Sequence, residues 1–244
     1  PERARLTRVA FVERRALGGC AARLAGGFIL ALACAAPADA ALTEGSRLRA
    51  IYDRILRAEF AVAHRELAPA CPPAPVPACK ALDAVALWWQ MQLDPESPDL
   101  DEPLKRASNE AIAASTAWTA REPQRGEAWF YLAGSYAPLV QWRVYRGERL
   151  AAARDGNRIR AALERGLALD PGLEDAHFGI GLYHYYAGVV PRAVKLLRLL
   201  LLLPGGDREQ GLREILEARD RGVLLRNEAD SVLGAAMAAA RVLQ

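Results

Sequence analysis

Residues 129–136, Trp-Phe-Tyr-Leu-Ala-Gly-Ser-Tyr, decide the fold of this chain. Their aromatic, Leu, small and Tyr positions have the spacing that is typical of the first helix in a repeated helical hairpin. Pro123 lies six residues before Trp129, and Pro171 lies six residues before His177. In such repeats a Pro ends one hairpin, and the position six residues later lies in the first helix of the next hairpin. Because this interval occurs twice, the sequence predicts an all-α protein built from antiparallel helix hairpins.

The central hairpin is longer than a standard unit. Trp129 and Pro171 are 42 residues apart. In a 34-residue repeat the corresponding two positions are about 28 residues apart. The additional residues, about 14, lengthen each arm of the hairpin by about two helical turns. We therefore expect helices over residues 127–146 and 148–169. Hydrophobic periodicity and Pro positions predict further helices over residues 47–67, over 80–93, from 101, from 173, over 208–221 and over 227–244.

The repeated spacing of aromatic, small and Pro positions over residues 80–244 resembles that of the tetratricopeptide-repeat (TPR) superfamily. The stretch 179–209 is similar to a group of exported bacterial members of that superfamily. The resemblance implies a TPR-like α-solenoid, here with lengthened and interrupted repeats, whose concave face binds a protein or peptide without catalysis. Since the helix expected over residues 227–244 has no capping partner, we expect further chain after Gln244.

The first 40 residues predict an export signal. This segment contains six Arg and three acidic residues. An apolar stretch covers residues 26–36, and Ala38-Asp39-Ala40 has the small-residue pattern that signal peptidase accepts. We expect cleavage after Ala40, by the Sec or the twin-arginine route, and a location in a bacterial periplasm or at the outer membrane. The remaining residues, 41–244, carry no net charge, which argues against nucleic acid as a partner.

Two cysteines remain after that cleavage, Cys71 and Cys79. An even pair in an exported protein predicts a disulfide. Four Pro lie between them, so we expect residues 71–79 to form a non-helical loop. The predicted organisation is a signal peptide over 1–40, a helix with the Cys/Pro loop over 41–79, and a helical repeat domain over 80–244.

The candidate binding residues are aromatic and basic. Tyr183, Tyr185 and Tyr186 cannot all face the core of one helix, and the hypothesis is that these three residues line a groove. Arg143, Arg146 and Arg149, near Tyr145, form a basic cluster that could meet an acidic peptide, and Arg143 and Arg146 are the candidates. The alternatives are packing between helices for the Tyr residues and a solvated face for the Arg residues.

Catalytic and metal-binding patterns are not apparent in the sequence. His177 and His184 are seven residues apart, too far along a helix to share one metal, and we expect both to be packing residues. Neither a phosphate-binding loop nor a nucleophile elbow can be recognised. We expect no catalysis and no cofactor.

An apolar, Leu-rich insertion over residues 191–203 interrupts the repeat that starts near residue 173. It is too short to cross a bilayer, and its Leu199 and Leu202 are candidates for a docking patch. Two hypotheses follow. The protein is an exported scaffold for a protein or peptide partner, or it is a carrier or docking module for lipid or a small apolar ligand, with membrane-surface contact through the insertion.

The export signal generates a direct prediction. N-terminal sequencing of the exported protein should start at Ala41-Leu42, because cleavage follows Ala40. An exported protein that retains residues 1–40 would contradict this.

Overall fold

The computed structural model describes residues 42–189 and 206–242, and over these residues every regular element is a helix. All of them belong to the unit Ala38–Gln244. The prediction of an all-α protein is therefore confirmed. The export signal and the insertion with Leu199 and Leu202 lie outside the described residues. Among the described helices, none combines the length and the apolar character that crossing a membrane requires.

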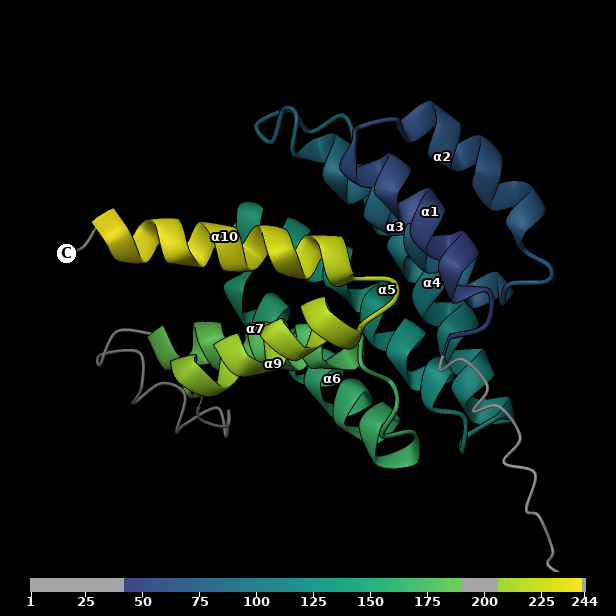
Figure 1. Ribbon diagram of the computed structural model, residues 1–244. Helices are drawn as coiled ribbons and strands as arrows, with labels where there is room; N and C mark the ends of the chain where they lie inside the picture. Colours follow the sequence, from purple (N-terminus) through teal and green to yellow (C-terminus); the bar gives the residue numbers. More distant parts are fainter. Residues whose placement is uncertain (1–41, 190–205, 243–244) are drawn as a thin grey trace, which may run out of the picture. The chain divides into compact units, whose positions relative to one another are not determined.

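The helices follow one another in space as they do in the chain (Figure 1), and each packs against the next. The α3 helix also packs against α1 and α5. The elements are α1 (Gly45–Leu56), α2 (Phe60–Leu67), a short 3-10 turn η1 (Ala68–Ala70), α3 (Val76–Met91), α4 (Asp101–Arg121), α5 (Gly126–Tyr145), α6 (Arg149–Leu169), α7 (Ala176–Val189), α9 (Arg208–Arg221) and α10 (Arg226–Val242).

The central hairpin forms as predicted. The α5 and α6 helices begin and end within one residue of the expected ranges. A short turn joins them, and Gly147 has a φ of 77° there, a conformation that favours glycine because it has no Cβ. The α9 helix also matches its predicted range. Asp207 caps it by accepting hydrogen bonds from the backbone N–H groups of Glu209 at 2.8 Å and Gln210 at 3.1 Å.

The prediction of one helix over residues 47–67 is wrong. The chain turns between α1 and α2, where Ala58 has a φ of 59°. Glu59 supports the turn by accepting a hydrogen bond from Arg54 at 2.8 Å and another from Arg57 at 3.0 Å. The turn lets both short helices bury their apolar faces, with Ile55 of α1 and Leu67 of α2 in one core. The hydrophobic period continues across the break, so periodicity alone does not reveal it.

The prediction of a non-helical Cys/Pro loop is wrong for its second half. The α3 helix already starts at Val76, and its first turn contains Pro77 and Cys79. A Pro is tolerated there because the first N–H groups of a helix have no partner within it. The predicted pairing is confirmed: the sulfur atoms of Cys71 and Cys79 are 2.03 Å apart.

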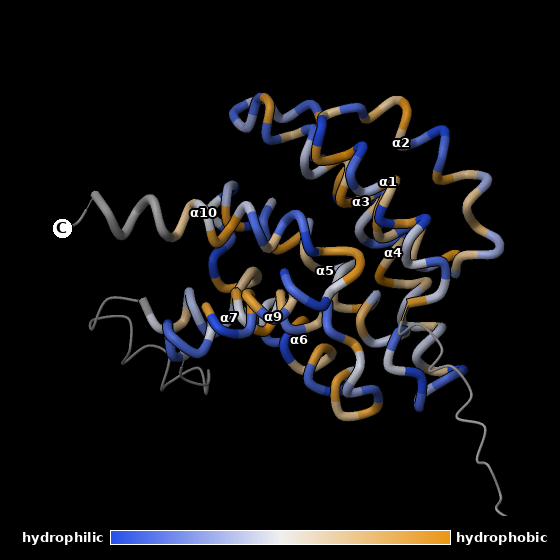
Figure 2. Tube along the Cα trace, viewed as in Figure 1, coloured by the Kyte–Doolittle hydropathy of each residue, from blue (hydrophilic) through white to orange (hydrophobic). Residues whose placement is uncertain are grey.

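Residues 42–79 belong to the same core as the rest of the described chain. Tyr52 and Ile55 of α1 share a buried cluster with Phe130 of α5 and Leu163 of α6. Figure 2 shows hydrophobic segments on helices throughout this unit. Polar contacts also connect the two parts, because the backbone N–H and Oγ1 of Thr43 lie 2.7 and 2.9 Å from the buried carboxylate of Glu127. The predicted boundary at residue 80 therefore does not separate two cores.

Two glycines bring α7 and α9 into close contact. A Cβ built on Gly211 would lie 2.5 Å from the carbonyl oxygen of Gly181 and 2.5 Å from the backbone nitrogen of Tyr185. Real Cβ atoms do not approach backbone atoms so closely. Gly134 of α5 is different, because a Cβ there would meet no atom within 4 Å.

We expect Gly211→Ala to destabilise the protein by about 1–3 kcal/mol, because the added methyl group must force α7 and α9 apart. The matched control is Gly134→Ala, which should stabilise by about 0.5–1 kcal/mol through helix propensity alone. Urea unfolding of both variants measures the difference. Equal stability of the two variants would contradict the close helix contact.

Candidate ligand cavity

The described helices line an open cavity of about 650 Å³. Its size is within the range of pockets that hold small molecules, roughly 300–1,000 Å³. The walls come from α1, α3, α5, α6, α7 and the region where α10 begins. They are mainly apolar, and among the lining residues three are charged: Arg149, Asp175 and Glu228. Typical wall residues are Leu82, Val85, Phe130, Ile159, Phe178 and Leu182.

The cavity is elongated and has a buried and an open end. Its lining on α5 runs from Phe130 to Val144, which corresponds to about 21 Å along the helix axis. On the antiparallel α6 it runs from Leu163 back to Arg149. Phe130 is 5% exposed, whereas Val144 is 54% exposed. We call the Phe130 side the inner end and the Val144 side the outer end.

Small residues on two facing helices leave this space open. The α5 wall contains Gly134, and the α6 wall contains Gly156. A Cβ built on either glycine would meet nothing within 4 Å. These glycines therefore do not bring helices together, as Gly181 and Gly211 do. The neighbouring wall positions are also small: Ala133, Ala137, Ala152 and Ala153.

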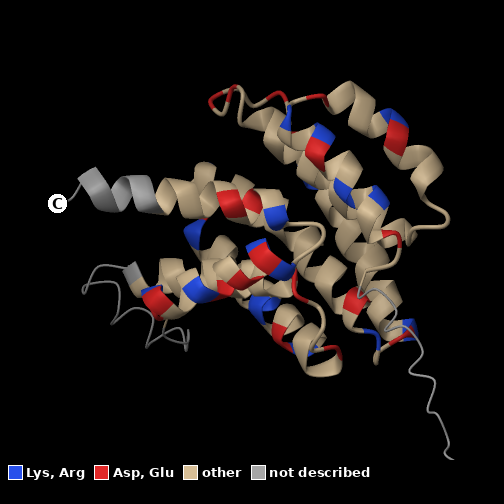
Figure 3. Ribbon diagram, viewed as in Figure 1, with Lys and Arg blue, Asp and Glu red and all other residues tan. Residues whose placement is uncertain are grey.

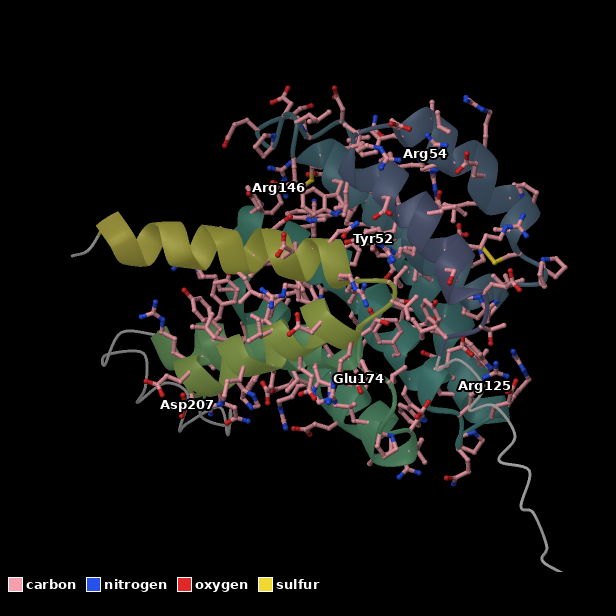
Figure 4. All side chains as sticks on the ribbon, viewed as in Figure 1. Tyr52, Arg54, Arg125, Arg146, Glu174 and Asp207 are labelled. Carbon is pink, nitrogen blue, oxygen red and sulfur yellow. A yellow bond between two sulfur atoms is a disulfide. The ribbon has the colours of Figure 1, made fainter. Side chains whose placement is uncertain are left out.

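At the inner end, α10 is connected to α1. The Tyr52 hydroxyl donates a hydrogen bond to Glu228, and Figure 4 shows Tyr52 between α1 and the start of α10. The Asn227 side chain donates to Asp53 at 2.6 Å. Burial raises the pKa of Glu228 to about 6, and the hydrogen bond from Tyr52 opposes that rise. Both partners of the Tyr52–Glu228 pair line the cavity.

Asp175 sets the position of the turn that leads into α10. It is 3% exposed, and its carboxylate accepts hydrogen bonds from the backbone N–H groups of Val223 at 2.9 Å and Leu225 at 2.7 Å. Burial raises its pKa, and these backbone hydrogen bonds act in the opposite direction. Asp175 therefore fixes one side of the inner end.

Tyr131 has an unpaired hydroxyl at the inner end. The side chain is 2% exposed and lines the cavity. Its ring stacks on Trp118 with centroids 6.2 Å apart, but its hydroxyl makes no hydrogen bond with any described residue. Buried polar groups normally have a partner, so this one needs an explanation.

At the outer end, Arg149 is exposed and lines the cavity. It is the first residue of α6. Its guanidinium group forms no ion pair with the residues that the structure describes. Arg143, by contrast, forms ion pairs with Asp155 and Glu148.

The sequence-predicted site residues are only partly brought together. Tyr183 and Tyr186 line the cavity. Tyr185 does not: it lies at the contact with α9, where its backbone is beside Gly211 and its ring is 5.6 Å from the guanidinium carbon of Arg208. The role of Tyr183 and Tyr186 in binding stays a prediction.

The two predicted Arg residues are engaged inside the protein. Arg146 forms an ion pair with Asp101 at 2.8 Å and donates to the backbone carbonyls of Pro95 and Ser97. The Arg146 guanidinium lowers the pKa of Asp101. Arg143 pairs with Asp155, which is 1% exposed. Both guanidinium groups therefore stabilise the connection between helices, and neither is among the cavity lining.

Sequence reasoning missed the residues that define the cavity. Gly134 and Gly156 carry a weak signal, because a glycine inside a predicted helix costs about 1 kcal/mol relative to Ala. Arg149 was noted only as part of a basic cluster, and its separation from Arg143 and Arg146 depends on their partners. Tyr52 and Glu228 are 176 residues apart, so no local pattern pairs them.

A group of possible metal ligands lies away from the cavity. Glu174, His177 and Glu217 have ligand atoms within 4.8 Å of one another. Arg221 already pairs with Glu174 at 3.4 Å and with Glu217 at 3.1 Å. The cluster is therefore explained as a partly exposed ion-pair network. His184 pairs with a different carboxylate, that of Glu214.

Charged residues of both signs are interspersed along the helices. Figure 3 shows basic and acidic positions along both α1 and α9. A binding surface for nucleic acid would instead gather basic residues on one face. This distribution agrees with the neutral composition of residues 41–244.

No family model, curated protein or solved structure matches this chain. The resemblance to tetratricopeptide repeats therefore stays a prediction from the sequence. The function has to be argued from the geometry and chemistry of the cavity.

The partly buried carboxyl of Glu228 generates a pH prediction. Because its folded-state pKa is raised from 4.5 to about 6, the stability it contributes is present below about pH 4.5 and is lost as the pH rises through about 6. The loss should be about 2 kcal/mol. Glu228→Gln keeps a neutral hydrogen-bonding side chain and should remove this part of the pH dependence.

Urea unfolding at several pH values between about 4.5 and 7 measures the effect. The wild-type protein should lose stability relative to Glu228→Gln across this range. A constant difference between the two proteins would contradict the raised pKa.

Proposed function

We propose that this protein binds a small apolar ligand, such as a lipid with one alkyl chain, in the elongated cavity, and acts as a carrier for it rather than as an enzyme. The observation that carries the proposal is the open space in front of Gly134 and Gly156. Two helices place residues without side chains toward the same apolar cavity. An elongated ligand fits this arrangement.

The energetics support an apolar occupant. Protein interiors are close-packed, and an apolar cavity left unfilled reduces stability. Burying an alkyl chain contributes about 0.8 kcal/mol per CH₂. The walls of Leu, Val, Ile and Phe side chains offer such a chain dispersion contacts and few hydrogen bonds. A polar ligand would be bound poorly there, because it would lose water without gaining partners.

The Tyr131 side chain lies at the inner end of the cavity. A buried donor without a partner costs about 1–3 kcal/mol. Ligand pockets commonly combine apolar walls with a few polar groups that orient the bound molecule. Tyr131 lines the inner end, but its hydroxyl is buried within the wall, so a ligand would reach this group only after a local rearrangement.

The arrangement of the hairpins fits the proposed TPR-like α-solenoid. Gly181 and Gly211 lie at the small-residue positions where the two helices of such a repeat come close together. The indole N–H of Trp129 donates a hydrogen bond at 3.0 Å to the backbone carbonyl of Pro123. These are the two residues whose six-residue interval predicted the start of the central hairpin.

A protein or peptide partner is the second candidate. Large hydrophobic side chains are exposed where the outer end of the cavity lies: Val144, Tyr145, Leu150 and Tyr186. An apolar peptide could use this rim. The cavity behind the rim favours a small ligand, because a peptide docked on the rim would leave the inner end empty.

Filling the cavity should prevent ligand binding without unfolding the protein. We expect Gly134→Leu and Gly156→Leu each to weaken binding of the neutral apolar dye Nile red at least about tenfold, since the new side chains occupy its space. Gly234→Leu is the matched control. Gly234 is also a helical glycine with no atom near its Cβ position, but it lies outside the cavity lining.

Fluorescence titration of the full chain measures dye binding, and thermal unfolding is the check on folding. The melting temperature of the two cavity variants should remain at or above that of the wild-type protein. Unchanged dye binding in the double variant Gly134→Leu/Gly156→Leu, or binding lost equally in Gly234→Leu, would overturn the proposal.

A further inference from the structure

We propose that the cavity selects a single-chain anionic amphiphile of the long-chain carboxylate type, with its carboxylate at Arg149 and its alkyl chain directed toward Tyr131. This inference rests on the proposed function and specifies the chemical class of the ligand and its direction in the cavity. It is carried by the distribution of charge along the cavity wall.

The charges on the wall are separated by sign. Arg149 lies at the outer end, and Asp175 and Glu228 lie at the inner end. An acidic head group at the inner end would meet two carboxyl groups that already have partners: Asp175 accepts from the backbone of Val223 and Leu225, and Glu228 accepts from Tyr52. An acidic head group at the outer end would meet a guanidinium group. Charge complementarity therefore gives the ligand one direction.

Arg149 is available for this contact. It forms no ion pair within the described part of the chain, whereas Arg143 and Arg146 are held by Asp155 and Asp101. A guanidinium group can donate two parallel hydrogen bonds to one carboxylate. Arg149 is the first residue of α6, and the acidic N-cap residue before it, Glu148, forms an ion pair with Arg143 at 3.5 Å.

The remaining wall fits an alkyl chain. Between the outer and inner ends, the α5 and α6 linings are formed mainly by small or apolar residues such as Ala137, Val140, Ala153 and Ile159, with Gln141 as a polar exception. No charged residue among the described lining lies between Arg149 and the inner pair. The other polar residues of the described lining, among them Gln141, Tyr183 and Tyr186, are uncharged, so Arg149 is the cationic group of that lining. A ligand with one acidic head group and one alkyl chain therefore matches the charge and the apolar surface of the wall.

Three ligands with the same chain test this assignment: dodecanoate, dodecanol and dodecyltrimethylammonium. We expect the full-length protein to bind dodecanoate about fivefold more tightly than dodecanol, the upper range for a partly exposed ion pair, and to bind the cation most weakly. Calorimetric titration measures the three dissociation constants. The preference for dodecanoate should shrink at high salt while dodecanol binding persists.

Variants assign the preference to Arg149. Arg149→Gln should abolish the difference between dodecanoate and dodecanol, and Arg149→Glu should reverse the preference toward the cation. Arg154→Gln is the matched control, because Arg154 is an exposed residue of α6 outside the cavity lining. It should leave all three dissociation constants unchanged.

The possible failures are distinguishable. Equal binding of dodecanoate and dodecanol, unaffected by Arg149→Gln, would overturn the head-group assignment and leave the apolar cavity in place. Binding of phosphatidylglycerol without binding of dodecanoate would overturn the single-chain assignment. If none of the three dodecyl ligands binds, the proposed function itself is wrong.

Discussion

The buried carboxylate of Asp175 is the interaction on which the rest of the cavity depends. A carboxylate removed from water is costly unless hydrogen bonds replace its hydration. Here the backbone N–H groups of Val223 and Leu225 supply them. The turn after α9 is thereby held against the start of α7, and this determines where α10 begins. The α10 helix then brings Glu228 to Tyr52 and Asn227 to Asp53.

Those contacts join helices from opposite ends of the described chain around an apolar space. The space exists because α5 and α6 contribute Gly134 and Gly156 to its wall, and a Cβ at either position would meet nothing within 4 Å. Each glycine inside a helix reduces stability by about 1 kcal/mol relative to Ala. Departures from good packing of this kind are expected at functional sites. A bound alkyl chain would restore the missing contacts.

The long central hairpin was predictable from the sequence because its signals are local. The spacing from Trp129 to Pro171 gave the lengths of α5 and α6, and Asp207 marked the start of α9 by a side chain that accepts from the next backbone amides. The pairing of Cys71 with Cys79 was likewise predictable from cysteine content. The break at Ala58 was not, because the apolar period continues through it and the turn is stabilised by ion pairs of Glu59.

The candidate site was less predictable, because periodicity identifies the face of a helix but not an empty volume between several faces. Tyr183 and Tyr186 were among the candidates because Tyr183, Tyr185 and Tyr186 lie so close together in one helix that they cannot all face its core. Arg143 and Arg146 looked equivalent to Arg149 in the sequence. Their acidic partners, Asp155 and Asp101, become visible only when helices are placed side by side. The close approach of Gly181 and Gly211 shows that the same residue type can also close a gap instead of opening one.

The most direct test of the account is the dependence of affinity on alkyl chain length. Calorimetric titration of the full-length protein with straight-chain carboxylates of increasing length gives the dissociation constant of each. If the cavity buries the chain, each added CH₂ should strengthen binding by about 0.8 kcal/mol, about fourfold, until the chain reaches the inner end and the gain stops. Affinities that do not change with chain length would contradict an apolar ligand cavity.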